Sequence, residues 1–190
     1  MQESREFVDQ MTRDLRDAGY PNRRNFAPGQ LNSPDVEAKE AADGVVKVDA
    51  GEIIFEGAVD GTKDVSTIKY FLDDDCPNPA CLKRSQEPKY QGSPLTQKYT
   101  PYVQVQNVIN DLATEPIFSA FRKDGTPVPL PVDLNNGDAM ASIGTIKIYL
   151  RVQSQVPDQR TGQRPILTFV STVKLPNCTM SYLSQGQSCD

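Results

Sequence analysis

The sequence contains no histidine among its 190 residues, and it has no long apolar run. Without an imidazole the chain cannot build a Ser-His-Asp or Cys-His nucleophile system, nor a metal site with histidine ligands. No apolar stretch approaches the roughly 20 residues that a helix needs to cross a bilayer. The commonest hydrolase mechanisms, and a helical membrane span within the printed residues, are therefore excluded.

Sequence motifs for nucleotide, ester or nucleic-acid chemistry are missing as well. No G-x-S-x-G, P-loop or G-x-G-x-x-G motif stands between a predicted strand and a helix. Lys and Arg total 20 against 25 Asp and Glu, so no basic footprint for nucleic acid is present. Paired carboxylates leave glycoside hydrolysis open in principle, but sequence alone cannot place two acids at the needed separation. We expect no enzyme, no cofactor and no resident metal.

Calcium stays open as an alternative because three turns are rich in oxygen ligands, although none has EF-hand spacing. A solvated turn is the plainer interpretation of each. The three turns are Asp73–Asp75, Asp60 with Asp64, and Asn135, Asn136 and Asp138.

Four cysteines carry the first positive indication. Cys76 and Cys81 flank a Pro-Asn-Pro-Ala turn, and Cys178 and Cys189 bracket a polar loop near the C-terminus. This spacing predicts two local disulfides, which belong in an oxidising compartment outside the cytosol. Four cysteines allow three pairings, and four free thiols or a zinc site are the alternatives. The spacings do not match common zinc patterns.

One amphipathic helix is predicted from Ser4 to Ala18. Its apolar residues Phe7, Val8, Met11 and Leu15 recur at intervals of three and four residues, which places them on one face. The rest of the helix surface is charged. We therefore expect this stripe to pack on the chain's own sheet.

The chain after the helix is predicted to consist of strands and loops. Gly19 and Pro21 end the helix, and 15 prolines with 12 glycines divide the rest into short segments. Strict alternation from Thr145 to Val152 predicts a strand with one buried face, paired in a hairpin with Pro165–Leu175. Another hairpin is predicted from 64–72 and 82–84, and further short strands at 45–48, 52–56, 99–109 and 117–122.

The predicted fold class is α+β, with the N-terminal α-helix packed on an antiparallel β-sheet, many strands and disulfide-stapled loops. We expect residues 1–20 to form the N-terminal helix and its stop, and residues 21–190 to form one β-rich globular domain.

Short motifs along most of the chain resemble, in the same order, those of type IV pilin-like proteins of the PilW minor-pilin type. Each motif alone has low specificity, and their order and spacing carry the resemblance. The motifs are Arg13–Pro21 with its Ala-Gly-Tyr helix stop, Ile54–Gly57, Ile68–Leu72, Leu82–Arg84, Ser119–Gly125, Ile146–Val152 and Val173–Asn177.

This resemblance implies a pilin-like fold and a structural role in a type IV pilus, within a minor-pilin complex that primes or tips the filament. It implies other minor and major pilins as partners. It also implies that the apolar stripe of the helix packs partly on neighbouring helices, as an assembly interface made of Phe7, Val8, Met11 and Leu15. Family members carry a leader and an apolar helix that are absent here, so we expect this chain to be the part that follows them. Residues 1–20 would then be the lower half of the longer pilin N-terminal helix. The whole protein would then be anchored in the inner membrane, face the periplasm and later reach the pilus or cell surface.

Two further functions remain open. A type II secretion pseudopilin of the J type has a similar architecture but serves a periplasmic pseudopilus. An extracellular ligand-binding β domain unrelated to pili belongs to a different class, because a fold does not by itself fix a function.

Overall fold

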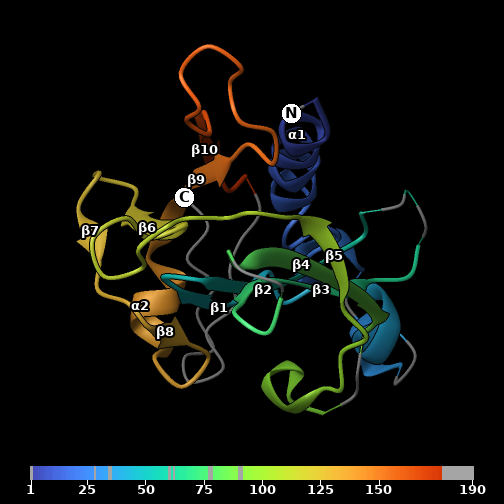
Figure 1. Cartoon of the computed structure of the whole chain (residues 1–190). Helices are drawn as coiled ribbons and strands as arrows, with labels where there is room; N and C mark the ends of the chain where they lie inside the picture. The colour runs from blue at the N-terminus through green and yellow to red at the C-terminus, as the bar shows by residue number, and fades with distance from the viewer. Residues whose placement is uncertain are drawn as a thin grey trace.

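Two antiparallel sheets and one long helix surround a common core in the computed structural model, which describes residues 2–27, 29–33, 36–59, 61, 63–76, 79–89 and 92–176 (Figure 1). The long helix is α1 (Gln2–Arg16). Sheet A consists, in spatial order, of β5 (Tyr102–Val105), β4 (Cys81–Pro88), β3 (Ser66–Asp73), β2 (Glu52–Gly57), β1 (Val45–Asp49) and β8 (Val132–Asp133). Sheet B consists of β10 (Ile166–Lys174), β9 (Ile143–Gln153), β6 (Phe118–Arg122) and β7 (Pro127–Val128).

Short helical segments lie in the connections between these elements. They are η1 (Arg23–Asn25), η2 (Gln30–Asn32), η3 (Val36–Glu40), η4 (Pro94–Thr96) and α2 (Gly137–Ala141). Within the described residues, no helix combines the length and the apolar character that crossing a bilayer requires.

The predicted fold class is wrong. The sequence predicted an α+β fold with the helix on one antiparallel sheet, whereas the chain forms two antiparallel sheets and its helical segments account for only 18% of it. The physical reason lies in the strands. Alternation shows that a strand has a buried face, but it does not show which sheet the strand joins. The protein is mainly β.

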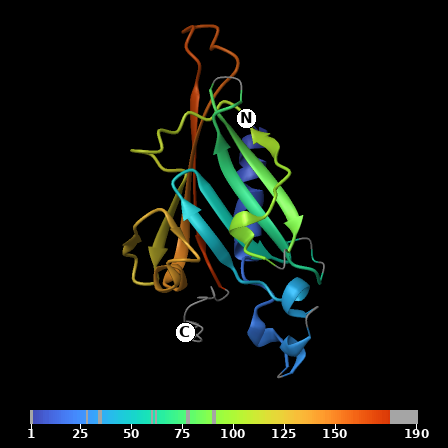
Figure 2. The same ribbon diagram turned by 90° about the horizontal axis from the view of Figure 1, so that it is seen from below.

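Helix α1 lies beside the β9–β10 hairpin and behind sheet A when the molecule is viewed from the sheet A side (Figure 2). The sequence predicted this helix, and the structure confirms it. Gly19 follows its end with φ 78°, a left-handed conformation that glycine adopts without strain. Ala18, just before it, forms an isolated β-bridge with Gly57 of β2. A Cβ atom added at Gly57 would lie 2.5 Å from the carbonyl oxygen of Asp17, so only glycine fits there.

The main core joins the helix to both sheets. Met11 from α1, Phe55 and Ile68 from sheet A, and Phe118 and Ile148 from sheet B are all fully buried in one apolar cluster. Strand β2 is buried on both of its faces, because a smaller cluster around Ile54 covers its outer side. The helix is therefore an integral part of the domain core.

Both predicted hairpins are present. Strands β9 and β10 pair without a break, from Thr145 opposite Lys174 to Gln153 opposite Ile166. Strands β3 and β4 pair from Asp73 opposite Cys81 to Ser66 opposite Pro88. In each hairpin a polar loop connects the two strands, and this loop is the local signal that made the hairpin predictable.

The disulfide between Cys76 and Cys81 closes the β3–β4 turn and confirms one of the two predicted pairings. Their Cα atoms are 5.7 Å apart, which suits a disulfide. Chain-entropy reasoning assigns about 2 kcal/mol to a loop of this length. The predicted pairing of Cys178 with Cys189 lies outside the described residues.

Candidate functional site

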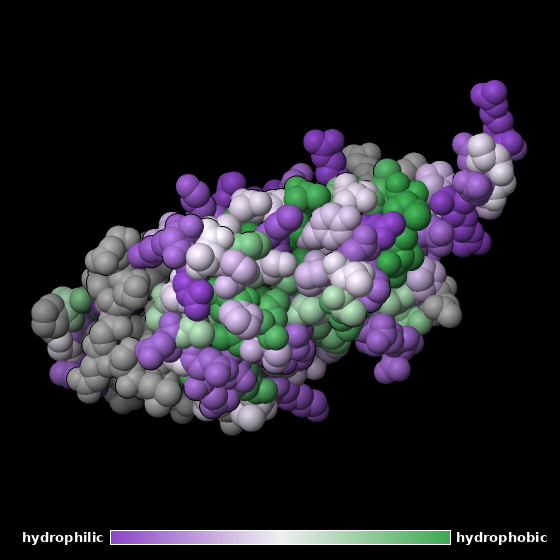
Figure 3. Space-filling view, turned by 90° about the vertical axis from the view of Figure 1, so that its left-hand side faces the viewer, coloured by the Kyte–Doolittle hydropathy of each residue, from purple (hydrophilic) through white to green (hydrophobic). Residues whose placement is uncertain are grey.

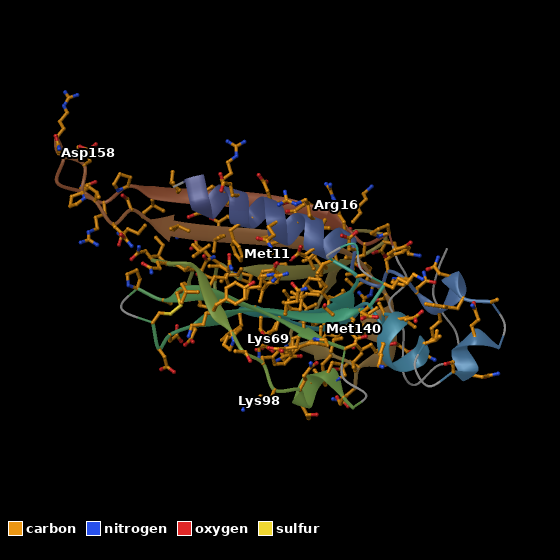
Figure 4. The ribbon with its side chains drawn as sticks, turned by 90° about the vertical axis from the view of Figure 1, so that its right-hand side faces the viewer. Met11, Arg16, Lys69, Lys98, Met140 and Asp158 are labelled. Carbon is orange, nitrogen blue, oxygen red and sulfur yellow. A yellow bond between two sulfur atoms is a disulfide. The ribbon has the colours of Figure 1, made fainter. Side chains whose placement is uncertain are left out.

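The apolar stripe of α1 faces the interior. Phe7, Val8, Met11 and Leu15 are each at most 5% exposed, and all belong to the main core. Figure 4 shows Met11 pointing from the helix toward the sheets, while Arg16 points away. The resemblance to pilins implies that these four side chains also contact neighbouring molecules. In this structure the chain's own core covers them almost entirely, so the surfaces open to a partner lie elsewhere.

A buried polar network fastens α1 to sheet A. The hydroxyl of Tyr70 donates to Oδ2 of Asp14 at 2.5 Å, and Nη2 of Arg84 lies 2.9 Å from the same oxygen. Nε of Arg84 donates to the Tyr70 hydroxyl at 3.0 Å. The guanidinium also donates to the hydroxyl of Tyr102 on β5 and to Oε1 of Gln86. One carboxylate of the helix is thus bonded to two strands.

Burial raises the pKa of Tyr70 well above its usual value, and the negative charge of Asp14 raises it further. Arg84 acts in the opposite direction. The same surroundings raise the pKa of Arg84, because the effects of Tyr70 and Asp14 outweigh its desolvation. At neutral pH the network therefore contains a neutral tyrosine and an arginine cation.

Replacing Tyr70 by phenylalanine is expected to flatten the loss of stability in alkali. A tyrosine whose pKa is higher in the folded than in the unfolded protein stabilises the fold below pH 10, and this contribution falls as the pH rises further. Between pH 10 and 11 the native protein should lose about 1 kcal/mol more than Tyr70→Phe. Urea unfolding at the two pH values measures this difference.

Tyr20→Phe is the matched control for that measurement, because Tyr20 is 51% exposed and outside the network. It should keep the pH dependence of the unchanged protein. Equal slopes for the unchanged protein and for Tyr70→Phe would show that Tyr70 does not stay protonated in the folded state.

A second buried cluster joins the segment before β1 to β2 and the end of β4. Nζ of Lys89 lies 2.9 Å from Oε2 of Glu56 and 3.4 Å from Oδ2 of Asp43. The backbone N–H of Asp43 donates to Oε2 of Glu56 at 3.0 Å. Burial raises the pKa of Glu56, as does Asp43, whereas Lys89 lowers it. The cluster lines neither of the grooves described below, so we assign it a structural role.

A half-open groove of about 730 Å³ lies between β5, the segment after it and the end of the β9–β10 hairpin. Ser4 at the start of α1 also lines it, together with Val156 and Leu167 from the hairpin. The described lining carries no charged side chain. Its polar side chains are the hydroxyls of two serines, Ser4 and Ser154, and five amides, namely Gln104, Gln106, Asn107, Gln153 and Gln155. Such a lining suits an uncharged polar ligand or backbone amides.

A smaller groove of about 540 Å³ lies between α1 and β5. Glu6, Phe7, Gln10 and Arg13 of the helix line it, with Gln104 opposite. It is shallow and mixed in charge, and no catalytic arrangement of side chains lies in it.

In one of the turns that suggested calcium from the sequence, Asp73–Asp75, a carboxylate is bonded to the chain itself. Oδ1 of Asp73 accepts the backbone N–H of Asp75, and its other oxygen pairs with Lys83. Asn135 donates its backbone N–H to Asp133. In the part of the chain that the structure describes, no three His, Cys, Asp or Glu residues lie together as metal ligands. Asp60 lies outside the described residues.

Sequence reasoning missed the buried polar network, although one signal was present. Asp14 lies on the apolar face of α1, three residues after Met11 and next to Leu15, where a solvated carboxylate is not expected. A charged residue within an apolar stripe indicates a buried partner. The identity of that partner, Arg84, is not encoded locally, because 70 residues separate the two.

Comparison of the chain with protein-family models, with curated proteins and with solved structures finds no match.

Proposed function

We propose that this protein is a structural subunit of a type IV pilus, a minor pilin of the PilW type that acts by docking in a priming or tip complex. Its partners in this proposal are other minor and major pilins. The mechanism is binding, without a chemical step. The protein would be held at the inner membrane, face the periplasm and then reach the pilus.

The observation that carries the proposal is the placement of α1. One face of the helix is buried in the core, the opposite face is charged, and its first residues lie at the margin of the molecule (Figure 1). A helix placed in this way can continue beyond the domain in its N-terminal direction without disturbing the fold. A pilin subunit requires such a continuation to reach the membrane and the filament core.

Two further observations support the proposal. The motifs that resemble PilW-type pilins fall on α1, β2, β3, β4, β6, β9 and β10. The residues that carry the resemblance therefore lie on the helix and on strands of both sheets. The Cys76–Cys81 disulfide suits an oxidising compartment such as the periplasm.

Deleting the gene tests the proposal, and we expect fewer surface pili and reduced pilus-dependent motility. Complementation with the full gene should restore both, because the subunit is needed for assembly. Electron microscopy and a motility assay measure the outcome. A parallel assay of type II secretion distinguishes the minor pilin from a J-type pseudopilin. If the protein is a J-type pseudopilin, the deletion strain should have a secretion defect and normal pili. Normal pili, motility and secretion in the deletion strain would contradict the assembly role.

The amide-lined groove favours one second candidate, an extracellular ligand-binding β domain. A volume of about 730 Å³ is in the range of small-molecule sites, and an uncharged polar lining suits a neutral ligand. This candidate is to be taken up if the deletion strain assembles pili and secretes normally.

A further inference from the structure

Strand β10 is the one long free edge among the strands that the structure describes. It forms the outer edge of sheet B, has nine residues and keeps an unbroken register with β9. The other sheet edges are short, since β5 has four residues and β7 and β8 have two each. Figure 1 shows β10 on the side of the molecule away from β1–β4.

The hydrogen-bond pattern shows which backbone groups of β10 point outward. Ser154 donates its N–H to the carbonyl of Pro165, and Leu175 donates to Gly144, at the two ends of the β9–β10 ladder. Bonded and non-bonded pairs alternate in an antiparallel ladder. The odd-numbered residues of β10 therefore bond to β9. The even-numbered residues direct their N–H and C=O groups away from it: Ile166, Thr168, Val170, Thr172 and Lys174.

The side chains of these even-numbered residues are also exposed, with Val170 57% and Ile166 47% accessible. Helix α1 covers the other face of β10, where the hydroxyl of Thr12 lies 2.9 Å from that of Ser171. Among the described residues, no strand pairs with this outer edge. Figure 3 shows the side of the molecule that carries β6 and β7, where apolar patches lie among polar residues toward the projecting loop.

This edge lacks the features that keep other edge strands from pairing. Natural edge strands are commonly short, bulged, interrupted by proline or charged. Residues 166–174 contain no proline and no bulge, and their single charge is Lys174 at the end. Four of the five outward-directed residues are β-branched, which favours strand pairing.

We propose that two copies of this chain pair through their β10 strands, antiparallel about a two-fold axis at Val170. The outward-directed residues of one strand then meet those of the other in hydrogen-bonded pairs. Val170 faces Val170, Thr168 faces Thr172, and Ile166 faces Lys174. About ten backbone hydrogen bonds form, because each such pair exchanges two.

The charges and the apolar side chains of this edge favour a second copy as the occupant. In this register no two like charges face each other across the interface, since each Lys174 lies opposite an isoleucine. The pairing joins two four-stranded sheets into one continuous sheet and covers the two exposed valines with each other. An isologous contact of this kind uses the same patch on both molecules. The inference does not depend on the proposed function.

Light scattering coupled to size-exclusion chromatography, over a range of concentrations, tests the proposal. The chain should approach twice its mass of 21.0 kDa as its concentration rises. Hydrogen exchange should show new protection at the even-numbered amides of residues 166–174 in the dimer. A chain that stays monomeric at every concentration, including one that binds only an extended peptide at this edge, overturns the proposal.

Val170→Pro is the decisive variant, because it removes an outward N–H at the two-fold axis while leaving the bonds to β9 intact. Dimer dissociation constants should rise roughly tenfold to a hundredfold, since two central hydrogen bonds are lost. Val170→Thr keeps the N–H and the branched side chain, and should dimerise like the unchanged chain. Val170→Lys is the substitute if the proline variant fails to fold. It places two cations opposite each other at an exposed position and should also separate the copies. An undiminished dimer in the folded variants overturns the proposal.

Discussion

Replacing Asp14 by alanine is expected to lower the free energy of unfolding by about 3–5 kcal/mol, because it leaves the Arg84 cation buried without its carboxylate. The side chains of Arg84 and Asp14 are only 5% and 9% exposed, so water cannot replace the lost partner at little cost. The hydroxyl of Tyr70 loses its acceptor as well. Urea unfolding at pH 7 measures the change, which corresponds to a fall in Tm of roughly 10 °C for a domain of this size.

Two further variants establish the cause. Asp9→Ala changes a carboxylate on the exposed face of the same helix, and should cost about 0.5 kcal/mol at most. The double variant Asp14→Leu with Arg84→Met removes both charges together, and should be more stable than Asp14→Ala alone. If Asp14→Ala and Asp9→Ala have equal effects, the buried pair does not hold the helix on sheet A.

Local signals made part of this fold predictable from the sequence. Helix α1 follows from the spacing of Phe7, Met11 and Leu15, and its end follows from Gly19. The β9–β10 hairpin follows from strict alternation on either side of a polar loop. Each of these signals lies within a few residues of the feature that it predicts, so the pattern alone was sufficient.

The division of the strands into two sheets was not predictable in the same way. Strand β6 pairs with β9, and β1 pairs with β8, across separations that no local pattern records. Strands β7 and β8, with two residues each, are too short to give a period. Periodicity identifies a buried face, whereas the assignment of that face to a sheet depends on long-range packing.

The candidate site shows the same limit. The sequence drew attention to the stripe on α1, and the structure places that stripe in the core. The free edge of β10 could not be identified before its pairing with β9 was known, because an edge is a property of strand order and not of composition. The Asp14–Arg84 pair required the three-dimensional fold for the same reason.

Replacing Met11 by alanine is expected to lower the free energy of unfolding by about 2–5 kcal/mol. Met11 is fully buried where α1 meets both sheets, so alanine leaves a cavity that close-packed neighbours fill only in part. Thermal and urea unfolding, followed by far-UV circular dichroism, measure the loss. Arg5→Ala, on the exposed face of the same helix, is the control and should change stability by about 0.5 kcal/mol or less.

The Met11 result also decides how defects in assembly are to be interpreted. If Met11→Ala destabilises the isolated domain and Arg5→Ala does not, the stripe holds this chain together. An assembly defect caused by polar stripe variants then follows from unfolding, because these side chains have almost no surface left for a neighbour. If Met11→Ala leaves the domain as stable as Arg5→Ala does, the helix does not depend on this core, and the stripe is free to contact neighbouring molecules as the resemblance to pilins implies.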